Sequence, residues 1–420
     1  MTRPTRVHVI GAGLAGLAAA LRLSEAGVAV VLHEAAPQAG GRCRSYFDTN
    51  LGCRIDNGNH LLVAGNRAAM AYLDAIGARD TLIGPEEARY DFLDVATGER
   101  WAFRPNRGRM PWWLFQRSRR VPGVKLGAYL GGVRLMRARP ADRVADVLSA
   151  DTAIYRRLWQ PLATAALNTE PENGSALLLA RVLRETFGAG GAACRPLVPR
   201  EGLSESLIDP AVAVLSQRGA TLRFGRRLRS IDDNYGRIAT LRFEDGEEHL
   251  GAADAVVLAV PAAVAPRLLP GIAAPHEFRA ILNAHFLMPS AVDGPPFIGL
   301  IGGTAEWVFR KGNVLSVTVS AADRLMDHDA EMISSSLWRD VRLAYGLGEA
   351  PIPPWQVVKE RRATFAATPA QQSRRPPART RWPNLALAGD WTDTGLPATV
   401  EGAIRSGFAA ASHILAGESP

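Results

Sequence analysis

The stretch RVHVIGAGLAGLAAALRLSEAGVAVVLHEA, residues 6–35, decides the fold. It starts with a short β-branched run, turns through GAGLAG, and continues as an apolar helical segment that ends at Gly27. VAVVLHEA is typical of a second strand, and its nearly continuous apolar character predicts burial on both faces of a parallel sheet. Strand, glycine turn, helix and strand in this order predict a dinucleotide-binding βαβ unit.

The glycine turn has the full fingerprint of such a unit. Gly11 allows the tight turn, Gly13 lets the backbone approach a pyrophosphate, and Gly16 lets helix and strand pack closely. The helix N-terminus then offers free N–H groups and the positive end of its dipole to the phosphates. Glu34, at the end of the second strand, is placed to accept a hydrogen bond from a ribose 2′-OH. The predicted contact set is completed by Ala12, Leu14, Ala15 and Ala35.

Composition and charge limit the classes of function that remain. The chain has 420 residues, 47% of them hydrophobic, and a formal net charge of +8 that is almost entirely arginine. This charge fits either arginine-rich codon usage or an anionic surface or ligand. Zinc-finger spacing, an RNA-binding signature and a lysine-rich tail are all missing, so nucleic acid is disfavoured.

The cysteines and the hydropathy of the chain indicate the cellular compartment and whether a metal site is expected. Cys43, Cys53 and Cys194 have no CxxC or metal-ligand spacing, which argues against a disulfide framework and a metal site. We find no signal peptide and no apolar run of about 20 residues without a break, the length that a spanning helix needs. We therefore expect a cytoplasmic protein.

The chain predicts an α/β architecture with two domains, each assembled from separate segments. Strand-rich, strongly apolar zones predict a cofactor domain from residues 1–65, 201–275 and 371–420. Residues 66–200 look mainly helical, and residues 276–370 carry short alternating strands. We expect these two insertions to form an α+β substrate-binding domain.

Two further motifs suggest which dinucleotide binds. Gly40-Gly41-Arg42 follows the second strand, and LALAGDWTDTGLPATVEGAIRSGFAAA lies near the C-terminus. Together with GxGxxG they resemble the flavin amine oxidase and phytoene desaturase superfamily. The resemblance implies a Rossmann-like FAD-binding domain of the GR2 type and non-covalent FAD. It places Gly41 and Arg42 near the pyrophosphate, Leu228 near the adenine and Gly389-Asp390 at the ribityl chain. The helix that begins near Thr399 and Val400 then points at the N1/O2 edge of the flavin.

RIDNGNHLLVAGN, residues 54–66, is an unusually polar stretch. One interpretation is a turn held by its own side chains. The other places it beside the isoalloxazine, where hydrogen-bond donors tune a flavin and a histidine can move protons. This second interpretation concerns Asp56, Asn57, Gly58, Asn59 and His60.

The DNGNH element and GDWTDTGLPATVEGAIRSG resemble one subgroup, the hydroxysqualene dehydroxylases of bacterial hopanoid biosynthesis. Asn59 departs from the glutamine expected there. The resemblance implies that reduced FAD delivers hydride to an allylic carbon of hydroxysqualene, that the hydroxyl leaves as water, and that squalene forms. His60 is the first candidate for the acid, and Asp56 for the group that orients or charges it.

RMPWWLFQRSRR, residues 109–120, sets four large apolar side chains between arginines. A C30 substrate partitions into the bilayer, and Trp and Arg together mark membrane interfaces. We expect Trp112, Trp113, Leu114 and Phe115 to contact an anionic membrane surface or the substrate entrance, within a segment at residues 107–139. The alternative is that these aromatics form the inner face of a substrate-domain helix.

Other functions remain open at this point. The same fold serves carotenoid desaturases and flavin amine oxidases, and Lys311 lies in the strand region where an amine oxidase lysine is expected. A different class is a non-catalytic prenyl-binding protein of the GDP-dissociation-inhibitor type. The intact GxGxxG, Glu34 and GDWTD argue against such a binding protein. No second glycine fingerprint follows a strand, so a tight NAD(P)H site is not indicated.

Overall fold

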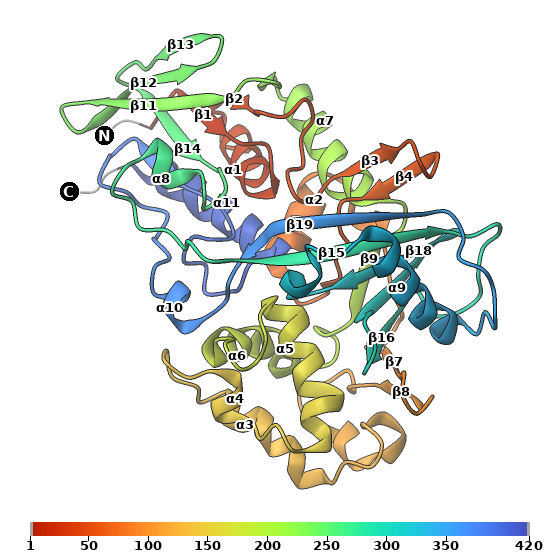
Figure 1. Ribbon diagram of the computed structural model, residues 1–420. Coiled ribbons are helices and arrows are strands. Elements are labelled where there is room, and N and C mark those ends of the chain that lie inside the picture. The colour runs from red at the N-terminus through yellow and green to blue at the C-terminus, as the bar shows by residue number, and fades with distance from the viewer. Residues whose placement is uncertain (1–2, 418–420) are drawn as a thin grey trace.

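A computed structural model describes residues 3–417 (Figure 1). Its first layer is a five-stranded parallel sheet, which draws its strands from three separated parts of the chain. In spatial order the strands are β10 (Thr221–Arg223), β2 (Ala29–His33), β1 (Arg6–Ile10), β14 (Asp254–Leu258) and β20 (Leu385–Leu387). β14 is buried along its whole length, as its apolar sequence requires.

Four helices share one apolar core with this sheet: α1 (Leu14–Glu25), α2 (Arg67–Ala75), α7 (Asp209–Gln217) and α11 (Val400–Ala416). α1 and α11 approach so closely that a Cβ at Gly407 would lie 2.1 Å from the Ala15 carbonyl oxygen. α2 falls in the segment that we assigned to the substrate-binding domain, yet Tyr72 and Leu73 are buried in this core. The first helix of that insertion therefore packs on the cofactor domain, because its apolar face has a partner there.

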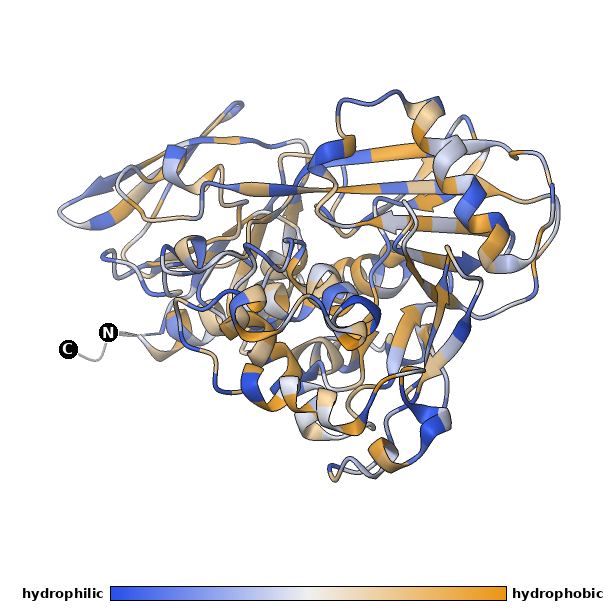
Figure 2. Cartoon of the chain, turned by 60° about the horizontal axis from the view of Figure 1, so that its bottom comes forward, coloured by the Kyte–Doolittle hydropathy of each residue, from blue (hydrophilic) through white to orange (hydrophobic). Residues whose placement is uncertain are grey.

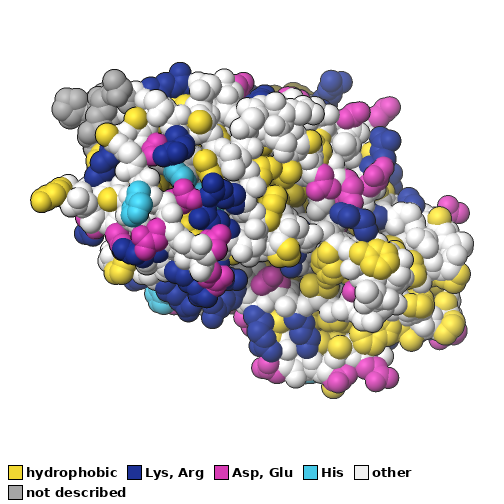
Figure 3. Space-filling model, turned by 90° about the horizontal axis from the view of Figure 1, so that it is seen from above, with side chains coloured by type: hydrophobic (Ala, Val, Ile, Leu, Met, Phe, Trp, Pro, Cys, Tyr) yellow, Lys and Arg dark blue, Asp and Glu magenta, His cyan; other side chains and the backbone are white. Residues whose placement is uncertain are grey.

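A three-stranded antiparallel sheet lies beside the first, formed by β11 (Leu228–Asn234), β12 (Arg237–Phe243) and β13 (Gly246–His249). Basic and acidic side chains mix on the surface that Figure 3 shows. Within this sheet and its approach they form pairs, including Arg226 with Asp245 and Arg242 with Asp232. The arginines of this region therefore leave little uncompensated charge.

The second layer is a seven-stranded sheet. In spatial order its strands are β19 (Trp355–Phe365), β15 (Phe278–Leu287), β18 (Val314–Val319), β17 (Trp307–Lys311), β16 (Phe297–Ile301), β7 (Tyr90–Asp94) and β8 (Arg100–Phe103). All neighbours are antiparallel except β16 and β7. α9 (Ala330–Tyr345) covers one face with Ile333, Leu337 and Val341. Residues 66–200 are mainly helical among their regular elements, as expected, but they also contribute β7 and β8, which complete the edge of this sheet.

The helices at the lower end of Figure 1 come from residues 131–185: α3 (Gly131–Leu135), α4 (Val144–Val147), α5 (Gln160–Leu167) and α6 (Ala176–Glu185). Single helical turns precede α3 in the chain, namely Trp112–Phe115, Arg117–Arg119 and Leu126–Leu130. Figure 2 brings this end forward and shows hydrophilic and hydrophobic residues alternating over short distances. Among residues 3–417, no helix is long and apolar enough to cross a bilayer.

The remaining short elements connect these layers. They are β3 (Ser45–Asp48), β4 (Cys53–Asp56), β5 (Leu62–Val63), β6 (Leu82–Ile83), β9 (Pro196–Pro199), α8 (Ala265–Leu268) and α10 (Pro369–Gln372), with helical turns at Arg79–Thr81, Tyr155–Trp159, Phe187–Ala189, Ser204–Ile208 and Ala322–Leu325. β3 and β4 pair with each other, and β4 leads directly into the polar stretch at Asp56.

Candidate active site

The three glycines of the first turn differ in what requires them. Gly11 has φ +107°, and a Cβ there would lie 2.5 Å from the Ala259 carbonyl oxygen; at Gly16 it would lie 1.8 Å from the Gly11 carbonyl oxygen. A Cβ at Gly13 would meet no atom of residues 3–417 within 4 Å. The space in front of Gly13 is therefore open to a pyrophosphate. α1 begins there at Leu14 without a side-chain cap, so its first N–H groups suit phosphate oxygens.

The carboxylate of Glu34 stabilises the first glycine turn through hydrogen bonds. It accepts hydrogen bonds from the backbone N–H groups of Ala12 at 2.7 Å and Ala36 at 2.8 Å. The backbone of Glu34 in turn accepts from Arg226 N at 2.8 Å, which brings the approach to Leu228 alongside residues 34–36. Leu228 itself is buried at the start of β11. Glu34 and the approach to Leu228, both expected around the adenosine, are thus neighbours. Sequence reasoning missed the hydrogen bond by which Glu34 holds the backbone of Ala12.

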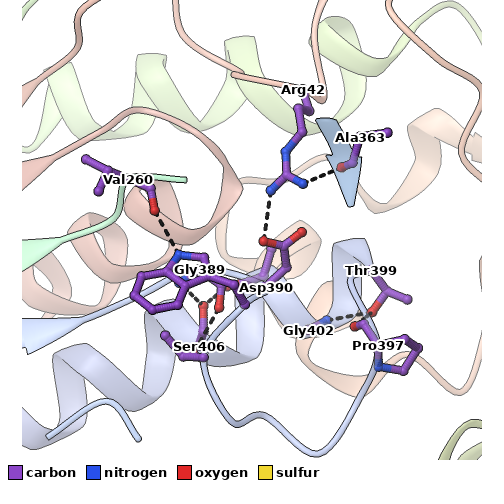
Figure 4. A network of polar contacts seen from close by, with 12 residues as sticks. Arg42, Val260, Ala363, Gly389, Asp390, Pro397, Thr399, Gly402 and Ser406 are labelled. Atoms are coloured by element: carbon purple, nitrogen blue, oxygen red, sulfur yellow. Dashed lines mark hydrogen bonds and ion pairs between the residues drawn. The ribbon is translucent and has the colours of Figure 1, made fainter. Parts of the chain in front are cut away.

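The second glycine turn lies against the first. Gly13 and Gly40 form a backbone bridge, and a Cβ at Gly41 would be 3.5 Å from the Gly13 Cα. Arg42 donates to the Asp390 carboxylate at 2.8 Å and to the Ala363 carbonyl at 2.5 Å (Figure 4). Asp390 raises the pKa of Arg42 above its ordinary value. The cation that we expected near the pyrophosphate is therefore bound to the carboxylate that we expected at the ribityl chain.

The C-terminal motif is ordered around the start of α11. Gly389 has φ +144°, and its N–H donates to the Ser406 hydroxyl at 2.8 Å. Thr399 is the N-cap of α11 and accepts from Gly402 N at 3.0 Å, as Figure 4 shows. The helix begins at Val400, where a negatively charged reduced flavin edge would be stabilised. Together with the two glycine turns, these groups fit FAD.

The side chain of Asp56 is used differently from our expectation. It accepts from the Ser45 hydroxyl at 2.6 Å and from Leu203 N at 2.9 Å, and it forms an ion pair with Lys311. Among the described residues, the ring of His60 has no hydrogen bond to Asp56 or to any other group. Asp56 is therefore not the orienting partner of His60. The pairing of Lys311 with Asp56 cannot be predicted from local sequence, because the two residues lie 255 positions apart along the chain.

Burial determines the charge of His60. Desolvation lowers the pKa of its imidazole to about 4, and the Asp56 carboxylate opposes this shift only partly. His285, on the facing sheet, shows the same effect: burial lowers its pKa to about 4, and its Nδ1 lies 2.7 Å from the Ser316 hydroxyl. Both rings are neutral near pH 7.

Side chains of the seven-stranded sheet form hydrogen bonds with residues 57–59, and sequence reasoning missed these side chains. Asn283 Nδ2 donates to the Asn57 carbonyl at 3.3 Å, and Asn59 Nδ2 donates to the Thr318 hydroxyl at 3.0 Å. Gly58 sits against this contact, because a Cβ there would be 3.2 Å from Asn283 Nδ2. The polar stretch is thus not held by its own side chains alone.

The face that makes these contacts is divided into a polar and an aromatic half. Residues that pair directly across adjacent strands share a face. One row across the sheet therefore contains Asn283, Thr318 and Trp307, and the next contains His285, Ser316, Phe309 and Phe297. Polar side chains lie on β15 and β18 beside residues 56–59, and aromatic side chains begin at β17.

Aromatic contacts continue from this face to the predicted entrance. Ring centroids are 6.1 Å apart for Phe309 and Phe297, 6.0 Å for Phe297 and Tyr90, and 6.3 Å for Tyr90 and Phe103. Phe103 then meets Trp113 at 5.0 Å. At the other end, Leu61 packs with Phe309 in one apolar cluster. An aromatic wall therefore extends from the neighbour of His60 to the tryptophan pair.

The tryptophan pair itself points in two directions. Trp113 packs on Phe103 and Tyr129, and Leu114 is half-buried. Trp112 and Phe115 expose 63% and 68% of their surface. One tryptophan therefore belongs to the inner aromatic wall, and the other faces outwards.

Comparison with known proteins agrees with this geometry. Residues 14–415 match the family of flavin containing amine oxidoreductases. Hydroxysqualene dehydroxylase of Rhodopseudomonas palustris is 51% identical over 412 residues, with 98% of each chain covered, and that of Sinorhizobium fredii is 48% identical over 412 residues, with 98% of this chain and 99% of the relative covered. The solved structure of cyclohexylamine oxidase from Brevibacterium oxydans shares the fold, with a TM-score of 0.69 at 16% identity over 98% of this chain and 99% of the other. The chain therefore belongs to the flavin containing amine oxidoreductases and, within them, to the hydroxysqualene dehydroxylase family.

Proposed function

We propose that the protein removes the hydroxyl group of hydroxysqualene reductively and releases squalene, for hopanoid or other triterpenoid synthesis. The relatives that carry this activity in their names align with almost the whole chain. The observation that carries the proposal is the divided sheet face: β15 and β18 present polar side chains beside residues 56–59, and aromatic side chains follow on β17 and β16. A long hydrocarbon with one hydroxyl needs such a division. Bound FAD, once reduced, supplies the hydride.

His60 is our proposed hydrogen-bond donor to the departing oxygen. Hydroxide is a poor leaving group, so loss of the C–O bond needs an acid nearby. Because burial lowers the pKa of His60 to about 4, its cationic form becomes common only below neutral pH. We therefore expect proton delivery through His60 to improve as the pH falls from 7 towards 5.

The aromatic half of the face suits the carbon that loses the hydroxyl. An allylic carbon develops positive charge as the C–O bond lengthens, and aromatic faces attract cations. Trp307 lies directly opposite Thr318, where the aromatic half begins. We propose that Trp307 and Phe309 contact the substrate next to the reacting carbon.

An anaerobic single-turnover experiment tests the function. The purified holoenzyme is reduced, hydroxysqualene is added in detergent, flavin absorbance is followed and the lipid is extracted. We expect the flavin to reoxidise and squalene to form in equal amount. No reoxidation with FAD bound would contradict dehydroxylation, and polyenes and amines would then be tested as substrates of the oxidised enzyme.

We further propose that the protein is cytoplasmic and binds anionic membranes through residues 107–139. This segment holds eight arginines, one lysine and no acidic residue, whereas the formal net charge of the whole chain is +8. The rest of the chain is therefore close to neutral. Exposed apolar side chains accompany the cations, namely Met110, Trp112, Phe115, Leu126, Leu130 and Val133. Apolar insertion and attraction to headgroups act together on such a surface.

A further inference from the structure

The hydrogen bonds between the sheet and the polar turn have a fixed direction. The Asn57 carbonyl can only accept, so the amide of Asn283 must present its Nδ2 there, at 3.3 Å. Its Oδ1 consequently faces Thr318, whose hydroxyl hydrogen it accepts at 2.8 Å. Asn283 and Thr318 are 1% and 9% exposed and pair directly across β15 and β18, so both side chains are fixed in place.

The direction of these hydrogen bonds also fixes the orientation of the Asn59 amide. A hydroxyl has a single hydrogen, and that of Thr318 is already donated to Asn283. Thr318 can therefore only accept from Asn59, whose Nδ2 donates at 3.0 Å. The amide of Asn59 is thereby oriented, and its Oδ1 is left as an acceptor.

The side-chain oxygen of Asn59 has no hydrogen-bond partner among residues 3–417. Its Oδ1 is buried and has no hydrogen bond to any described residue. A buried acceptor without a donor is costly, and proteins rarely retain one unless something else supplies the donor. An oriented amide with a spare buried oxygen is therefore a ligand-binding feature.

We propose that Asn59 Oδ1 accepts the O–H hydrogen of the substrate and is the atom that recognises the hydroxyl, an inference that rests on the proposed dehydroxylation. Thr318 and Asn283 are positioning residues that aim this oxygen. The hydroxyl is the only donor in a C30 alcohol, and the neighbouring Trp307 and Phe309 suit its hydrocarbon. Accepting the hydrogen leaves the oxygen lone pairs free for the proton that accompanies C–O cleavage, so hydride goes to carbon and water departs.

The same arrangement selects substrate over product. Squalene has no donor, so its binding leaves Asn59 Oδ1 unpaired, and a site built around a hydroxyl discriminates against an analogue that lacks it. We expect the holoenzyme to bind hydroxysqualene about tenfold or more tightly than squalene, as one recovered hydrogen bond allows. Weak binding of the product would favour its release.

The test measures three dissociation constants for each variant with oxidised FAD bound: hydroxysqualene and squalene by perturbation of the flavin spectrum, and FAD by titration of the apoprotein. For Asn59→Leu, which keeps the size of the side chain, we expect affinity for hydroxysqualene to fall about tenfold, and the constants for squalene and FAD to change less than twofold. Thr318→Val should lower the preference for the alcohol in the same direction. Thr318→Ser keeps the hydroxyl relay and should preserve the preference.

Each other outcome overturns the assignment. An unchanged preference in Asn59→Leu would show that the oxygen does not bind the hydroxyl. Weaker FAD binding or a shifted flavin spectrum, with the preference retained, would assign the acceptor to the cofactor. If the wild-type holoenzyme itself does not distinguish the alcohol from the hydrocarbon, no recognition atom exists. Failure of the proposed reaction is seen separately, as binding of hydroxysqualene without squalene in the single-turnover experiment.

Discussion

Lys311 and Asp56 form an ion pair across the boundary between the seven-stranded sheet and the cofactor domain, with side chains only 17% and 5% exposed. The pair lies at the end of β4, where the chain turns into the polar stretch that contains His60. Asp56 also receives the Ser45 hydroxyl and Leu203 N, so one carboxylate joins four parts of the chain. Its role is to hold the stretch in position.

Removing the cation should therefore destabilise the protein. We expect Lys311→Met to lower the free energy of unfolding by about 3 kcal/mol, because a buried carboxylate loses its counter-charge. The double variant Asp56→Asn with Lys311→Met should lose less than the sum of the two single variants. Urea denaturation of the four proteins measures this coupling, and additive losses would contradict a direct interaction. Retained FAD and turnover in Lys311→Met would also argue against an amine oxidase role for this lysine.

His60→Ala should bind FAD normally and lose most of its turnover, since no described residue is hydrogen-bonded to the ring and the flavin framework lies in other segments. In the wild type, turnover should rise as the pH falls from 7 towards 5, because the pKa of the imidazole is lowered to about 4. Stopped-flow rates of flavin reoxidation across this range test the role. Loss of FAD in His60→Ala would assign the ring a structural function, and a flat pH profile would exclude it as the proton donor.

Gly13 and Gly16, two of the three glycines of the first turn, should respond differently to alanine. At Gly13 a methyl group would have no atom of the described residues within 4 Å, so Gly13→Ala should keep its stability as apoprotein and lose FAD affinity by at least about tenfold, because the pyrophosphate needs that space. At Gly16 the methyl group would overlap the Gly11 carbonyl, so Gly16→Ala should unfold or aggregate. Thermal melts and FAD titration separate the effects. Normal FAD binding by Gly13→Ala would contradict the predicted pyrophosphate position.

Trp112→Ser with Phe115→Ser should weaken sedimentation with vesicles of anionic lipid, since each exposed side chain contributes about 1.5–3 kcal/mol when fully inserted. Met332→Ser with Leu343→Ser is a matched control, because these residues of α9 are also exposed and lie outside residues 107–139. Added salt should reduce binding of the wild type, because the headgroups are met by the arginines of residues 107–139, of which only Arg119 forms an ion pair among the described residues. Equal sedimentation of all three proteins would contradict the membrane surface.

Stability should fall with acid in a defined range. The pKa of His285 is lowered to about 4 in the folded protein and is about 6.5 when unfolded, so the unfolded chain binds more protons between these values. The stabilisation is fully present above pH 6.5 and is lost as the pH falls through 4, by about 1.4 kcal/mol per pH unit for each such group. Urea midpoints from pH 7.5 to 4.5 should show a shallower decline for His285→Gln than for wild type. His249→Gln, which alters an exposed residue of β13, serves as control.

The cofactor domain was accessible to sequence reasoning because its signals are local. Gly11, Gly13 and Gly16 mark a turn, and the run before them marks the strand that β1 confirms. The partners of the polar stretch were not accessible, because Asn283 and Thr318 lie 226 and 259 residues from the groups they bind. Their meeting depends on the register between β15 and β18. A weaker signal was nevertheless present: Asn283 and His285, like Ser316 and Thr318, are polar residues at alternate positions of mainly apolar strands.

The order of strands in the parallel sheet has a consequence for the newly made chain. β1 can pair with β2 as soon as the first 33 residues of the chain are made. Its other edge can pair only after β14 (Asp254–Leu258) is made, and β14 in turn pairs with β20 (Leu385–Leu387). During synthesis, an apolar strand edge is thus left open while more than half of the protein is still being translated. Such edges recruit other chains. We therefore expect the yield of native protein to depend on elongation rate and on chaperones that shield the nascent N-terminal half, although the finished sheet buries all of β1 except Arg6 between its neighbours.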